Sequence, residues 1–523
     1  MSPELGQAVD FDIMNTTASP SARTTAELAS AFGLTTSGGA VQITGVALDN
    51  RQVRPGDVFA ALPGAHQHGA SFAAAAVAAG ARAVLTDPAG AQLLGELGVP
   101  VLVADDVRAV LGQVSAWVYG DPAEGLRTFG VTGTNGKTTT TYLLEEVLHR
   151  TGRTTGLIGT VELKVGQEHV PARLTTPEAP AIQALLARMV SRSVTDLVME
   201  VSSHALAQHR VDGIVYDLVA FTNLTADHLD FHGGIENYFA VKADLFTPER
   251  ARRGVVLVDD EWGQRMAREA QVPVVTVSTR PDGPDADWQA SITVGRADHT
   301  SFALTHRDGR SLSTAIWMPG RFNVANAALA LVMALESGLT TREVHTSIGD
   351  GLRAHVPGRM EQVATQPRCI VDFAHNAEAL ELVLRALRPT TKGRLLVVFG
   401  ATGERDVAKR PEMGRVTVAG ADVVVITDDD PHDEEPGTIR RQVLAGALGA
   451  VPAAQRAGRT VDVFEVAPRA EAIRRAVLSA GPNDTVLVAG RGHETVQEVA
   501  GVEHHLDDRA EVRAALAERE SHR

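Results

Sequence analysis

FGVTGTNGKTTT, at residues 129–140, has apolar residues first, then a glycine-containing turn, then Lys137 and a run of threonines. Residues 142–148 follow with the pattern of an amphipathic helix. A strand, a glycine turn and a helix N-terminus in this order direct backbone N–H groups and the helix dipole at an anion. The stretch therefore predicts a phosphate-binding loop, in which Lys137 adds a positive charge and the hydroxyl of Thr138 reaches Mg²⁺.

The match to the phosphate-loop pattern G-x-x-x-x-G-K-[ST] is incomplete, because Val131 stands where the first glycine belongs. Gly133 and Gly136 supply the backbone freedom instead. The alternative is an ordinary glycine- and threonine-rich loop before a helix. We favour a nucleotide site because the lysine, the threonines and the flanking strand and helix all coincide.

The composition bounds the class of protein. The chain has 523 residues, 44% hydrophobic and 22% charged, with a formal net charge of −15. The length suggests about three domains, and the acidic balance disfavours nucleic acid and anionic membranes as partners. The single cysteine, Cys369, excludes a disulfide framework and fits a reducing cytoplasm. The N-terminus lacks the apolar core of a signal peptide, and no run approaches the roughly 18 apolar residues of a membrane helix.

The organisation along the chain predicts an α/β protein. We expect a disordered lead at residues 1–20 and a small α/β domain at 21–124, which ends near Asp121-Pro122. A second domain, at 125–352, holds the phosphate loop in a mainly parallel sheet. In the third, at 353–523, four buried apolar runs alternate with helical segments, which predicts a parallel Rossmann-like sheet.

Polar side chains follow two predicted strands of the second domain. Glu200 ends one strand and His228 follows the next, and ligands of open α/β sheets lie at the carboxyl ends of strands. A carboxylate and an imidazole beside phosphates suit Mg²⁺. Alone, His228 would be interpreted as a helix cap or a core histidine, but Asp227 and Asp230 beside it favour a site. Spacing alone would make Lys242 a solvated lysine on a helix surface.

An acidic loop follows the predicted strand at 423–427. Three aspartates at 428–430 are consistent with a solvated loop, but the strand before them and the stiff proline after them favour a loop that binds an ammonium group. Arg405, Arg491 and Glu494, also at predicted strand ends, are open to the same two interpretations. A zinc site is not expected from the spacing of His66, His68, His204 and His209.

Short motifs from Leu48 to Glu494 occur in a characteristic order and spacing. Together they resemble the Mur ligase family, most closely the MurE type. The motifs are LDNR at 48–51 with PGD at 55–57, GTNGKTT at 133–139, EVSSH at 200–204 with QHR at 208–210, TNL at 222–224, DHLD at 227–230, FNVAN at 322–326, GRME at 358–361, DFAH at 372–375 and GRGHE at 490–494.

The resemblance implies a first domain that holds a UDP-sugar, a central ATPase domain and a C-terminal domain that brings an amino acid. It implies ATP- and Mg²⁺-dependent addition of that amino acid to UDP-MurNAc-L-Ala-D-Glu in cytoplasmic peptidoglycan precursor synthesis. The carboxylate of the nucleotide peptide attacks the γ-phosphate to give an acyl phosphate, and the amine then displaces phosphate. We expect a monomer with no nucleic-acid or membrane partner.

Site residues are carried over by position. Lys242 resembles the family lysine that reacts with CO₂ to form a carbamate, so the metal contacts would be Thr138, Glu200, His228 and Lys242, and the catalytic residues Lys137, Glu200, His228 and Lys242. The ATP contacts would be Gly133, Thr134, Asn135, Gly136, Lys137, Thr138, Thr139, Asn323, Asn326, Arg359 and Asp372. The UDP-MurNAc-dipeptide contacts would be Leu48, Asn50, Ala65, His66, Gln67, Thr175, Thr176, Ser202, Gln208 and Arg210. The amino-acid contacts would be Arg405, Asp429, Asp430, Pro431, His432, Gly490 and Glu494.

The acidic loop departs from the family in a way that bears on specificity. Diaminopimelate-adding members carry Asp-Asn-Pro-Arg where this chain has Asp429-Asp430-Pro431-His432. That arginine grips the second carboxylate of diaminopimelate in a bidentate way that histidine does not reproduce. Asp430 adds a negative charge suited to a terminal ammonium group, and lysine-adding members show a similar Asp-Asp-Pro pattern. We therefore predict L-lysine, with L-ornithine and meso-diaminopimelate as alternatives.

Rival functions of other kinds are weaker. A folylpolyglutamate-synthase-like ligase shares the core, but the N-terminal domain that carries Asp49-Asn50-Arg51 disfavours it. A non-catalytic or amidotransferase-partner Mur-like protein would be expected to lose Lys137 or Lys242, and both are present. The sequence shows no partner-binding surface typical of a mechanical phosphate-loop switch.

Overall fold

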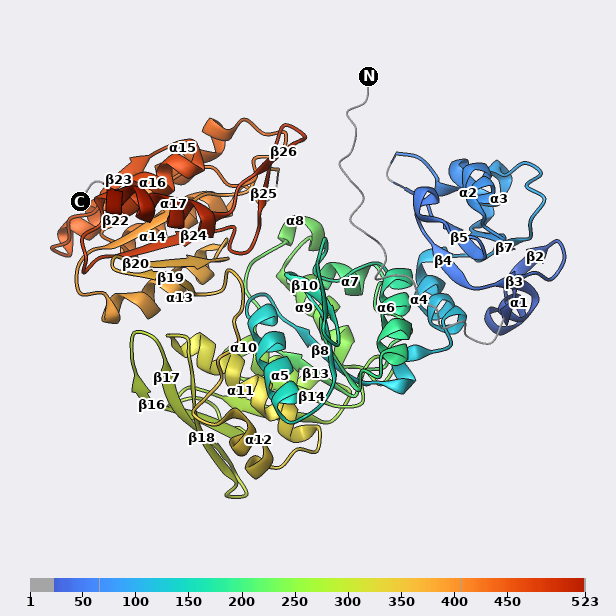
Figure 1. The fold of residues 1–523 in the computed structure, drawn as a ribbon, viewed down its shortest axis with the longest axis horizontal. Coiled ribbons are helices and arrows are strands. Elements are labelled where there is room, and N and C mark those ends of the chain that lie inside the picture. Colours follow the sequence, from blue (N-terminus) through green and yellow to red (C-terminus); the bar gives the residue numbers. More distant parts are fainter. Residues whose placement is uncertain (1–22, 65, 405, 522–523) are drawn as a thin grey trace.

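The computed structural model describes residues 23–64, 66–404 and 406–521, and Figure 1 shows three α/β units in chain order. The lead expected at 1–20, together with Ala65 and Arg405, lies outside these residues. Each unit has its own main sheet and its own buried core. Within the described ranges, no helix has both the length and the apolar character that crossing a membrane requires.

The first unit is built on a five-stranded sheet with the order β2-β7-β6-β5-β4. Strands β4 to β7 pair in parallel, while β2 is antiparallel to β7. Leu28, Val58 and Leu85 are fully buried in its core. The bounds are β1 (Arg23–Thr24), β2 (Thr35–Ser37), β3 (Gln42–Ile43), β4 (Gly45–Ala47), β5 (Asp57–Ala61), β6 (Ala83–Thr86), β7 (Val101–Val103), α1 (Thr25–Phe32), α2 (Ala73–Ala79), α3 (Pro88–Leu93) and α4 (Val107–Val118).

The second unit contains an eleven-stranded sheet with the order β11-β10-β9-β12-β8-β13-β14-β15-β16-β17-β18. The strands from β9 to β16 in this order are parallel, which confirms the predicted mainly parallel sheet. Antiparallel pairs extend it at both ends, beyond what the sequence predicts. The strand bounds are β8 (Arg127–Thr132), β9 (Thr155–Ile158), β10 (Glu162–Val165), β11 (Glu168–Pro171), β12 (Asp196–Glu200), β13 (Leu218–Phe221), β14 (Gly254–Leu257), β15 (Val274–Ser278), β16 (Trp288–Gly295), β17 (Thr300–His306) and β18 (Ser311–Ile316).

Helices α5 and α11 of this unit pack against each other. Residues 323–335 of α11 are all buried, so the helix is part of the core rather than a surface helix. The helix bounds are α5 (Lys137–Arg150), α6 (Ala179–Ser191), α7 (Ser203–Ala207), α8 (Leu229–His232), α9 (Ile235–Ala243), α10 (Glu261–Glu269), α11 (Arg321–Glu336) and α12 (Thr341–Ile348).

The third unit has a six-stranded sheet with the order β19-β20-β24-β21-β22-β23, parallel except for β19. Its strands β20, β21, β22 and β24 are the four apolar runs that the sequence predicts. A separate hairpin, β25–β26, follows β24. The bounds are β19 (Glu361–Thr365), β20 (Arg368–Asp372), β21 (Leu395–Phe399), β22 (Val423–Ile426), β23 (Asp462–Glu465), β24 (Thr485–Ala489), β25 (Val496–Val499), β26 (Val502–His505), α13 (Ala377–Leu387), α14 (Lys409–Gly420), α15 (Pro436–Arg456), α16 (Arg469–Ser479) and α17 (Asp508–Ser521).

Candidate active site

The predicted phosphate loop lies between β8 and α5 and depends on two glycines. Gly133 has a φ of 145° and Gly136 a φ of 92°. A Cβ on Gly133 would lie 1.9 Å from Oγ1 of Thr222, and one on Gly136 would lie 2.4 Å from Oδ1 of Asn326. Both positions therefore require glycine, for conformation and for space.

Lys137 folds back over this loop. Its ammonium group donates to the carbonyl oxygens of Gly133 and Thr134 at 3.0 and 2.9 Å. Burial lowers the pKa of Lys137, while the charges of Glu200 and Asp227 raise it. Both hydrogen-bond acceptors are neutral, so the positive charge remains available to a phosphate group.

Glu200, at the end of β12, is fully buried beside the start of α5. Its carboxylate accepts hydrogen bonds from the hydroxyls of Thr138 and Thr160, both at 3.0 Å, and from the Thr160 backbone N–H at 2.7 Å. A threonine hydroxyl next to a carboxylate is the kind of hard oxygen pair that Mg²⁺ prefers. The donor set therefore fits a magnesium ion.

Lys242, on α9, is also buried at this loop rather than exposed on a helix surface. Its Nζ donates to the Gly133 carbonyl at 2.9 Å and lies 4.5 Å from the centre of the Tyr238 ring. Burial, and then the charge of Lys137, lower the pKa of Lys242 well below its usual value. A buried lysine with a lowered pKa holds a larger share of neutral, nucleophilic amine.

Asp227 and His228 lie where the second and third units meet. Partial burial lowers the pKa of His228 to about 4, against the opposing charge of Asp227, so its imidazole is neutral at pH 7. His375 and Lys409, from the third unit, lie 3.7 and 4.0 Å from the Asp227 carboxylate. Burial raises the pKa of Asp227, but His375, His228 and Lys409 lower it by more. The net pKa lies below its usual value, so the carboxylate stays charged.

The third unit also reaches the phosphate loop through Arg359. Its guanidinium lies 3.4 Å from the Thr138 hydroxyl and 4.1 Å from the centre of the Phe373 ring. Asp372 accepts from the backbone N–H groups of Met360 and Ala374 at 2.6 and 2.8 Å, which fixes the segment that carries Arg359. Asp372 thus positions Arg359 at the phosphate loop and does not itself contact the loop through these hydrogen bonds.

Asn135 forms a second bridge between the two units. Its Nδ2 donates to Glu378 at 3.1 Å, and its Oδ1 accepts from Asn376 at 3.3 Å. Asn326 lies against the loop, 3.5 Å from the Thr140 hydroxyl, whereas Asn323 donates to the Pro319 carbonyl just before α11.

A group of predicted substrate contacts lies beside the backbone of Glu200. The Thr176 hydroxyl donates to the Glu200 carbonyl at 2.8 Å and accepts from the Ser202 N–H at 3.1 Å. Arg210 donates to the Thr176 carbonyl and to the Gln208 side chain, at 3.1 and 2.6 Å. The structure therefore brings these four residues together at the edge of the phosphate site, Ser202 through its backbone N–H. The Thr175 hydroxyl lies 3.1 Å from that of Thr160.

The remaining predicted substrate contacts lie on the first unit. Leu48 and Asn50 follow β4, and the exposed His66 and Gln67 follow β5. They follow the carboxyl ends of two adjacent parallel strands, as a binding edge of an α/β sheet requires. Ala65 lies outside the described residues.

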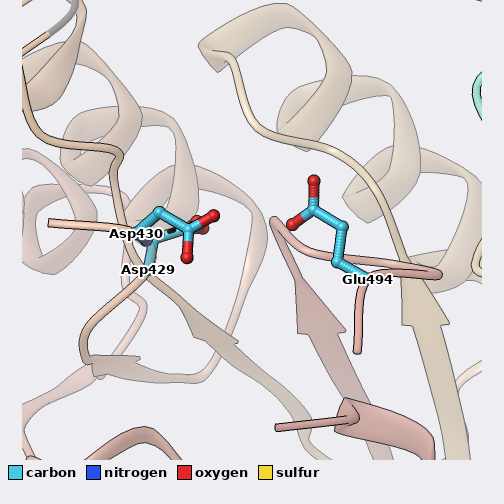
Figure 2. A group of neighbouring side chains, drawn as sticks. All are labelled: Asp429, Asp430 and Glu494. Atoms are coloured by element: carbon cyan, nitrogen blue, oxygen red, sulfur yellow. Dashed lines mark hydrogen bonds between the residues drawn. The ribbon is translucent and has the colours of Figure 1, made fainter. Parts of the chain in front are cut away.

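Three carboxylates converge after β22 and β24 (Figure 2). Oxygens of Asp429, Asp430 and Glu494 lie within 4.8 Å of one another, with Glu494 facing the two aspartates. A Cβ on Gly490, which has a φ of 115°, would come within 2.5 Å of Asp429. Burial, with the charges of Asp429 and Asp430, raises the pKa of Glu494 to about 8, although Arg491 opposes this.

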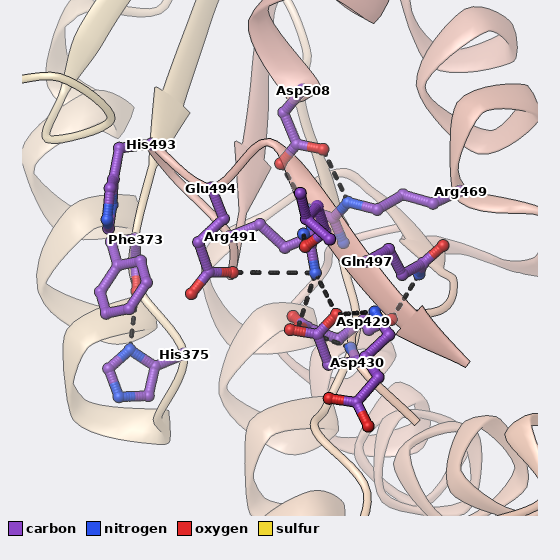
Figure 3. Close-up of polar contacts among 12 residues, drawn as sticks. Phe373, His375, Asp429, Asp430, Arg469, Arg491, His493, Glu494, Gln497 and Asp508 are labelled. Carbon is purple, nitrogen blue, oxygen red and sulfur yellow. Dashed lines mark hydrogen bonds and ion pairs between the residues drawn. The ribbon is translucent and has the colours of Figure 1, made fainter. Parts of the chain in front are cut away.

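Arg491 sits at the centre of this cluster and is fully buried (Figure 3). It lies 2.5 Å from Asp430 but 3.9 and 3.7 Å from Asp429 and Glu494. The charge of Asp430 is thus balanced inside the protein, which corrects the expectation that Asp430 itself offers a free charge to an ammonium group. Asp429 and Glu494 are more loosely held.

Several residues of this site were not singled out from the sequence. Thr160 contacts Glu200, His375 and Lys409 contact Asp227, and Glu378 contacts Asn135, but all except His375 stand in an unremarkable sequence context. The position of His375 inside the motif at 372–375 was the one available signal. For Glu378 and Lys409, no local pattern distinguishes them from solvated helix residues.

Comparison with protein families gives matches along most of the chain. Residues 42–119 match the model described as Mur ligase family, catalytic domain; residues 131–334 match the Mur ligase middle domain; and residues 358–492 match the Mur ligase, glutamate ligase domain.

Two similar relatives cover nearly the whole chain. A Streptomyces coelicolor protein named UDP-N-acetylmuramoyl-L-alanyl-D-glutamate–2,6-diaminopimelate ligase is 49% identical over 95% of this chain and 97% of its own length. A Leifsonia xyli protein named UDP-N-acetylmuramyl-tripeptide synthetase is 44% identical over 95% and 97%.

Solved structures agree on the fold. The structure of a UDP-N-acetylmuramoyl-L-alanyl-D-glutamate–2,6-diaminopimelate ligase superposes with a TM-score of 0.63 at 31% identity, over 92% of this chain and 96% of that one. MurF ligase from Thermotoga maritima, solved with ADP, has a TM-score of 0.63 at 17% identity, over 92% of this chain and 98% of its own, and supports the fold alone.

Proposed function

The chain belongs to the Mur ligase family, and from this premise we propose that it is an ATP-dependent tripeptide synthetase that adds an amino acid to UDP-MurNAc-L-Ala-D-Glu in peptidoglycan precursor synthesis. The observation that carries the proposal is the phosphate loop, where Lys137, Glu200 and the buried Lys242 converge. A mechanical nucleotide switch has no use for a buried lysine of lowered pKa at this place.

We propose the following roles for the chain's own residues. The loop N–H groups and Lys137 hold the triphosphate, and Arg359 reaches it from the third unit. Thr138 and Glu200 would hold one Mg²⁺; His228, together with Lys242 as its carbamate, would hold a second. Carbamate formation joins the neutral Lys242 amine to CO₂ and releases a proton, which turns a cation into an anion. Bound Mg²⁺ supplies neutralisation of the charge on the transferring phosphoryl group.

The reaction then has two steps. The glutamate carboxylate of the nucleotide peptide attacks the γ-phosphorus, and ADP leaves with the electron pair of the broken P–O bond. The amine attacks the resulting acyl phosphate, phosphate leaves, and an amide bond forms. Phosphorylation is needed because a carboxylate is a poor electrophile. Preorganised cations at the loop stabilise the charge that gathers in the first step.

The nucleotide peptide would bind between the first and second units. Thr176, Ser202, Gln208 and Arg210 already form a connected polar group beside Glu200. We propose that they orient the peptide, while residues after β4 and β5 hold the UDP-sugar. Domain boundaries near residues 124 and 352 fit this proposal, in which the first unit holds the UDP-sugar and the second orients the peptide.

For the amino acid, we propose L-lysine first and L-ornithine next. The supporting observation is the cluster of Asp429, Asp430 and Glu494 around the guanidinium of Arg491, which favours a terminal ammonium group. meso-Diaminopimelate is the third candidate, because the Streptomyces coelicolor relative is named for it. We further propose a cytoplasmic monomer.

The test is release of ADP by the purified protein with ATP, Mg²⁺ and UDP-MurNAc-L-Ala-D-Glu, supplied with one amino acid at a time. We expect turnover with L-lysine or L-ornithine to exceed turnover with meso-diaminopimelate. Turnover with meso-diaminopimelate alone would contradict the specificity proposal. Absence of turnover with all three would contradict the proposed enzyme.

A further inference from the structure

The arginines around the acidic loop are already engaged. Four described arginines contact residues 428–434 or lie beside them, and each has a carboxylate partner. The pairs are Arg440 with Asp428, Arg491 with Asp430, Arg410 with Glu434 and Arg469 with Asp508. Among the described residues at this loop, no guanidinium is therefore left over for a second carboxylate on an incoming amino acid.

The hairpin β25–β26 is fastened to the same loop by its main chain. The N–H of Glu498 donates to the Asp430 carboxylate at 3.0 Å, and the N–H of His432 donates to the Glu498 carbonyl at 3.3 Å. The N–H of Ala500 donates to the His432 carbonyl at 2.7 Å. Gln497 donates to the Asp429 carbonyl, as Figure 3 shows. The hairpin is thus a fixed wall beside the acidic cluster.

The side chain of Glu498 projects from this wall next to His432. Its carboxylate lies 3.2 Å from Nδ1 of His432 and is partly exposed. The imidazole fixes the carboxylate in place, while its exposed side stays open to a ligand. Glu498 thereby brings a further negative charge to a loop that already holds three carboxylates around one arginine.

We infer that Glu498, held by His432, selects the amino acid: its carboxylate favours a terminal ammonium group and repels a second carboxylate. This inference rests on the proposed function and deepens it. Asp430, whose charge is taken up by Arg491, acts as a positioning residue that holds the hairpin. The selective charges are those of Asp429 and Glu498.

The contact between Glu498 and position 432 determines what an arginine there can do. An arginine placed at 432 would meet Glu498 at once and form an ion pair with it. The guanidinium introduced by the single substitution His432→Arg is therefore engaged by Glu498 and is not free to hold a second carboxylate. Acceptance of diaminopimelate requires that Glu498 is changed as well.

The test compares the wild type with Glu498→Gln, His432→Arg and the double variant. The matched control is Glu503→Gln, an exposed glutamate directly opposite Glu498 on the same hairpin. The quantity measured is kcat/KM for L-lysine and L-ornithine relative to kcat/KM for meso-diaminopimelate. Loss of one close charge interaction, about 1.4 kcal/mol, corresponds to about a tenfold change.

We expect Glu498→Gln to lower the ratio about tenfold, and the double variant to lower it further, on the same scale for a close charge pair. Glu503→Gln should leave the ratio within about twofold, since its carboxylate is screened by solvent. The KM values for ATP and for UDP-MurNAc-L-Ala-D-Glu should not change in any variant, which distinguishes a selective residue from a merely structural one.

Equal ratios in Glu498→Gln and Glu503→Gln would overturn the inference, and so would a wild type that prefers meso-diaminopimelate. Hydroxylamine separates this failure from failure of the proposed function, because it traps an acyl phosphate without any amino acid. If the wild type forms hydroxamate but the kcat/KM ratios of the variants equal that of the wild type, the role of Glu498 is refuted and the ligase is not. No hydroxamate and no ADP refute the ligase as well.

Discussion

Lys242 shows how much a single residue depends on its surroundings. Its ammonium group is buried against the Gly133 carbonyl and the Tyr238 ring. A permanent charge is costly there, and burial lowers the pKa of Lys242 well below its usual value. Conversion to a carbamate would exchange this poorly solvated cation for an anion that Mg²⁺ neutralises.

Lys242→Ala should therefore lose at least about a hundredfold in kcat, the cost typical of removing one group that stabilises transition-state charge. Formate or acetate should restore part of the activity, because a small carboxylate can occupy the place of the carbamate. ADP release measures both effects. The exposed Lys392 offers the control, since Lys392→Ala should retain wild-type activity. Full activity of Lys242→Ala without added acid would exclude the carbamate.

Glu494 gives a pH-dependent prediction in the absence of substrates. Burial and the neighbouring aspartates raise the pKa of Glu494 from 4.5 to about 8. Because the raised pKa belongs to the folded state, the protein is most stable with respect to this group below pH 4.5. That stability is lost as the pH rises to about 8, and it changes no further above that.

Glu494→Gln removes this loss. The difference in melting temperature between Glu494→Gln and the wild type should grow from pH 5 to pH 8, to a few degrees, and then level off. Scanning calorimetry over pH 5 to 9 measures it. Glu503→Gln should give a difference that does not vary with pH. The same flat profile for Glu494→Gln would mean that Glu494 titrates normally.

Helices α16 and α17 are joined by two ion pairs in very different surroundings. Arg469 and Asp508 are both fully buried and 2.7 Å apart. Arg474 and Glu518 join the same helices at 2.5 Å on the surface, with the Arg474 side chain 45% exposed. The two pairs therefore test how burial sets the cost of breaking an ion pair.

Arg469→Ala leaves Asp508 buried without its partner and should cost about 3–5 kcal/mol of unfolding free energy. Arg474→Ala should cost less than about 1 kcal/mol, because water replaces the lost partner. Urea unfolding measures both. The double variant Arg469→Met/Asp508→Leu should recover most of the loss, and a double variant no better than Arg469→Ala would contradict the account.

Local patterns predicted some elements and not others. The β8–loop–α5 unit and the strands of the third sheet are continuous apolar runs beside glycine turns, so the sequence signal is local. Strands β16 to β18 were not predicted, because β16 is exposed over most of its length and depends on antiparallel partners. The phosphate-loop part of the site was predicted for the same local reason.

The rest of the site depends on contacts between residues far apart in the chain. Asp430 and Arg491 are 61 residues apart, and the sequence around either residue does not indicate that the other is its partner. Glu498 lies on an exposed hairpin with no distinctive pattern. Burial of Lys242 follows from the packing of α9, and only the family resemblance implies a place for it at a metal site.

In the molecule as a whole, the third unit closes over the second through a few polar contacts. Asn135 meets Glu378, Asp227 meets His375, and Thr138 meets Arg359. Every one of these contacts involves a residue at or near the phosphate loop. Contact between the two units and the proposed nucleotide binding would therefore share the same residues.

Glu378→Ala should weaken closure and raise KM for ATP about tenfold, the effect expected for a lost hydrogen bond to a charged group. Glu381→Ala is the control, since Glu381 lies on the same helix and pairs with Arg385 instead. Small-angle X-ray scattering with a non-hydrolysable ATP analogue should show a larger radius of gyration for Glu378→Ala alone. Identical scattering and KM in the two variants would show that this contact does not hold the closed form.

The hairpin β25–β26 is docked largely through main-chain groups, with the N–H groups of His432, Glu498 and Ala500 as donors. These main-chain hydrogen bonds do not depend on which side chain stands at position 498. A point mutation in evolution can therefore replace that side chain without changing the hairpin or the phosphate loop. The composition of a bacterial cell wall would then be open to change by drift at a few positions, while the catalytic apparatus is inherited intact.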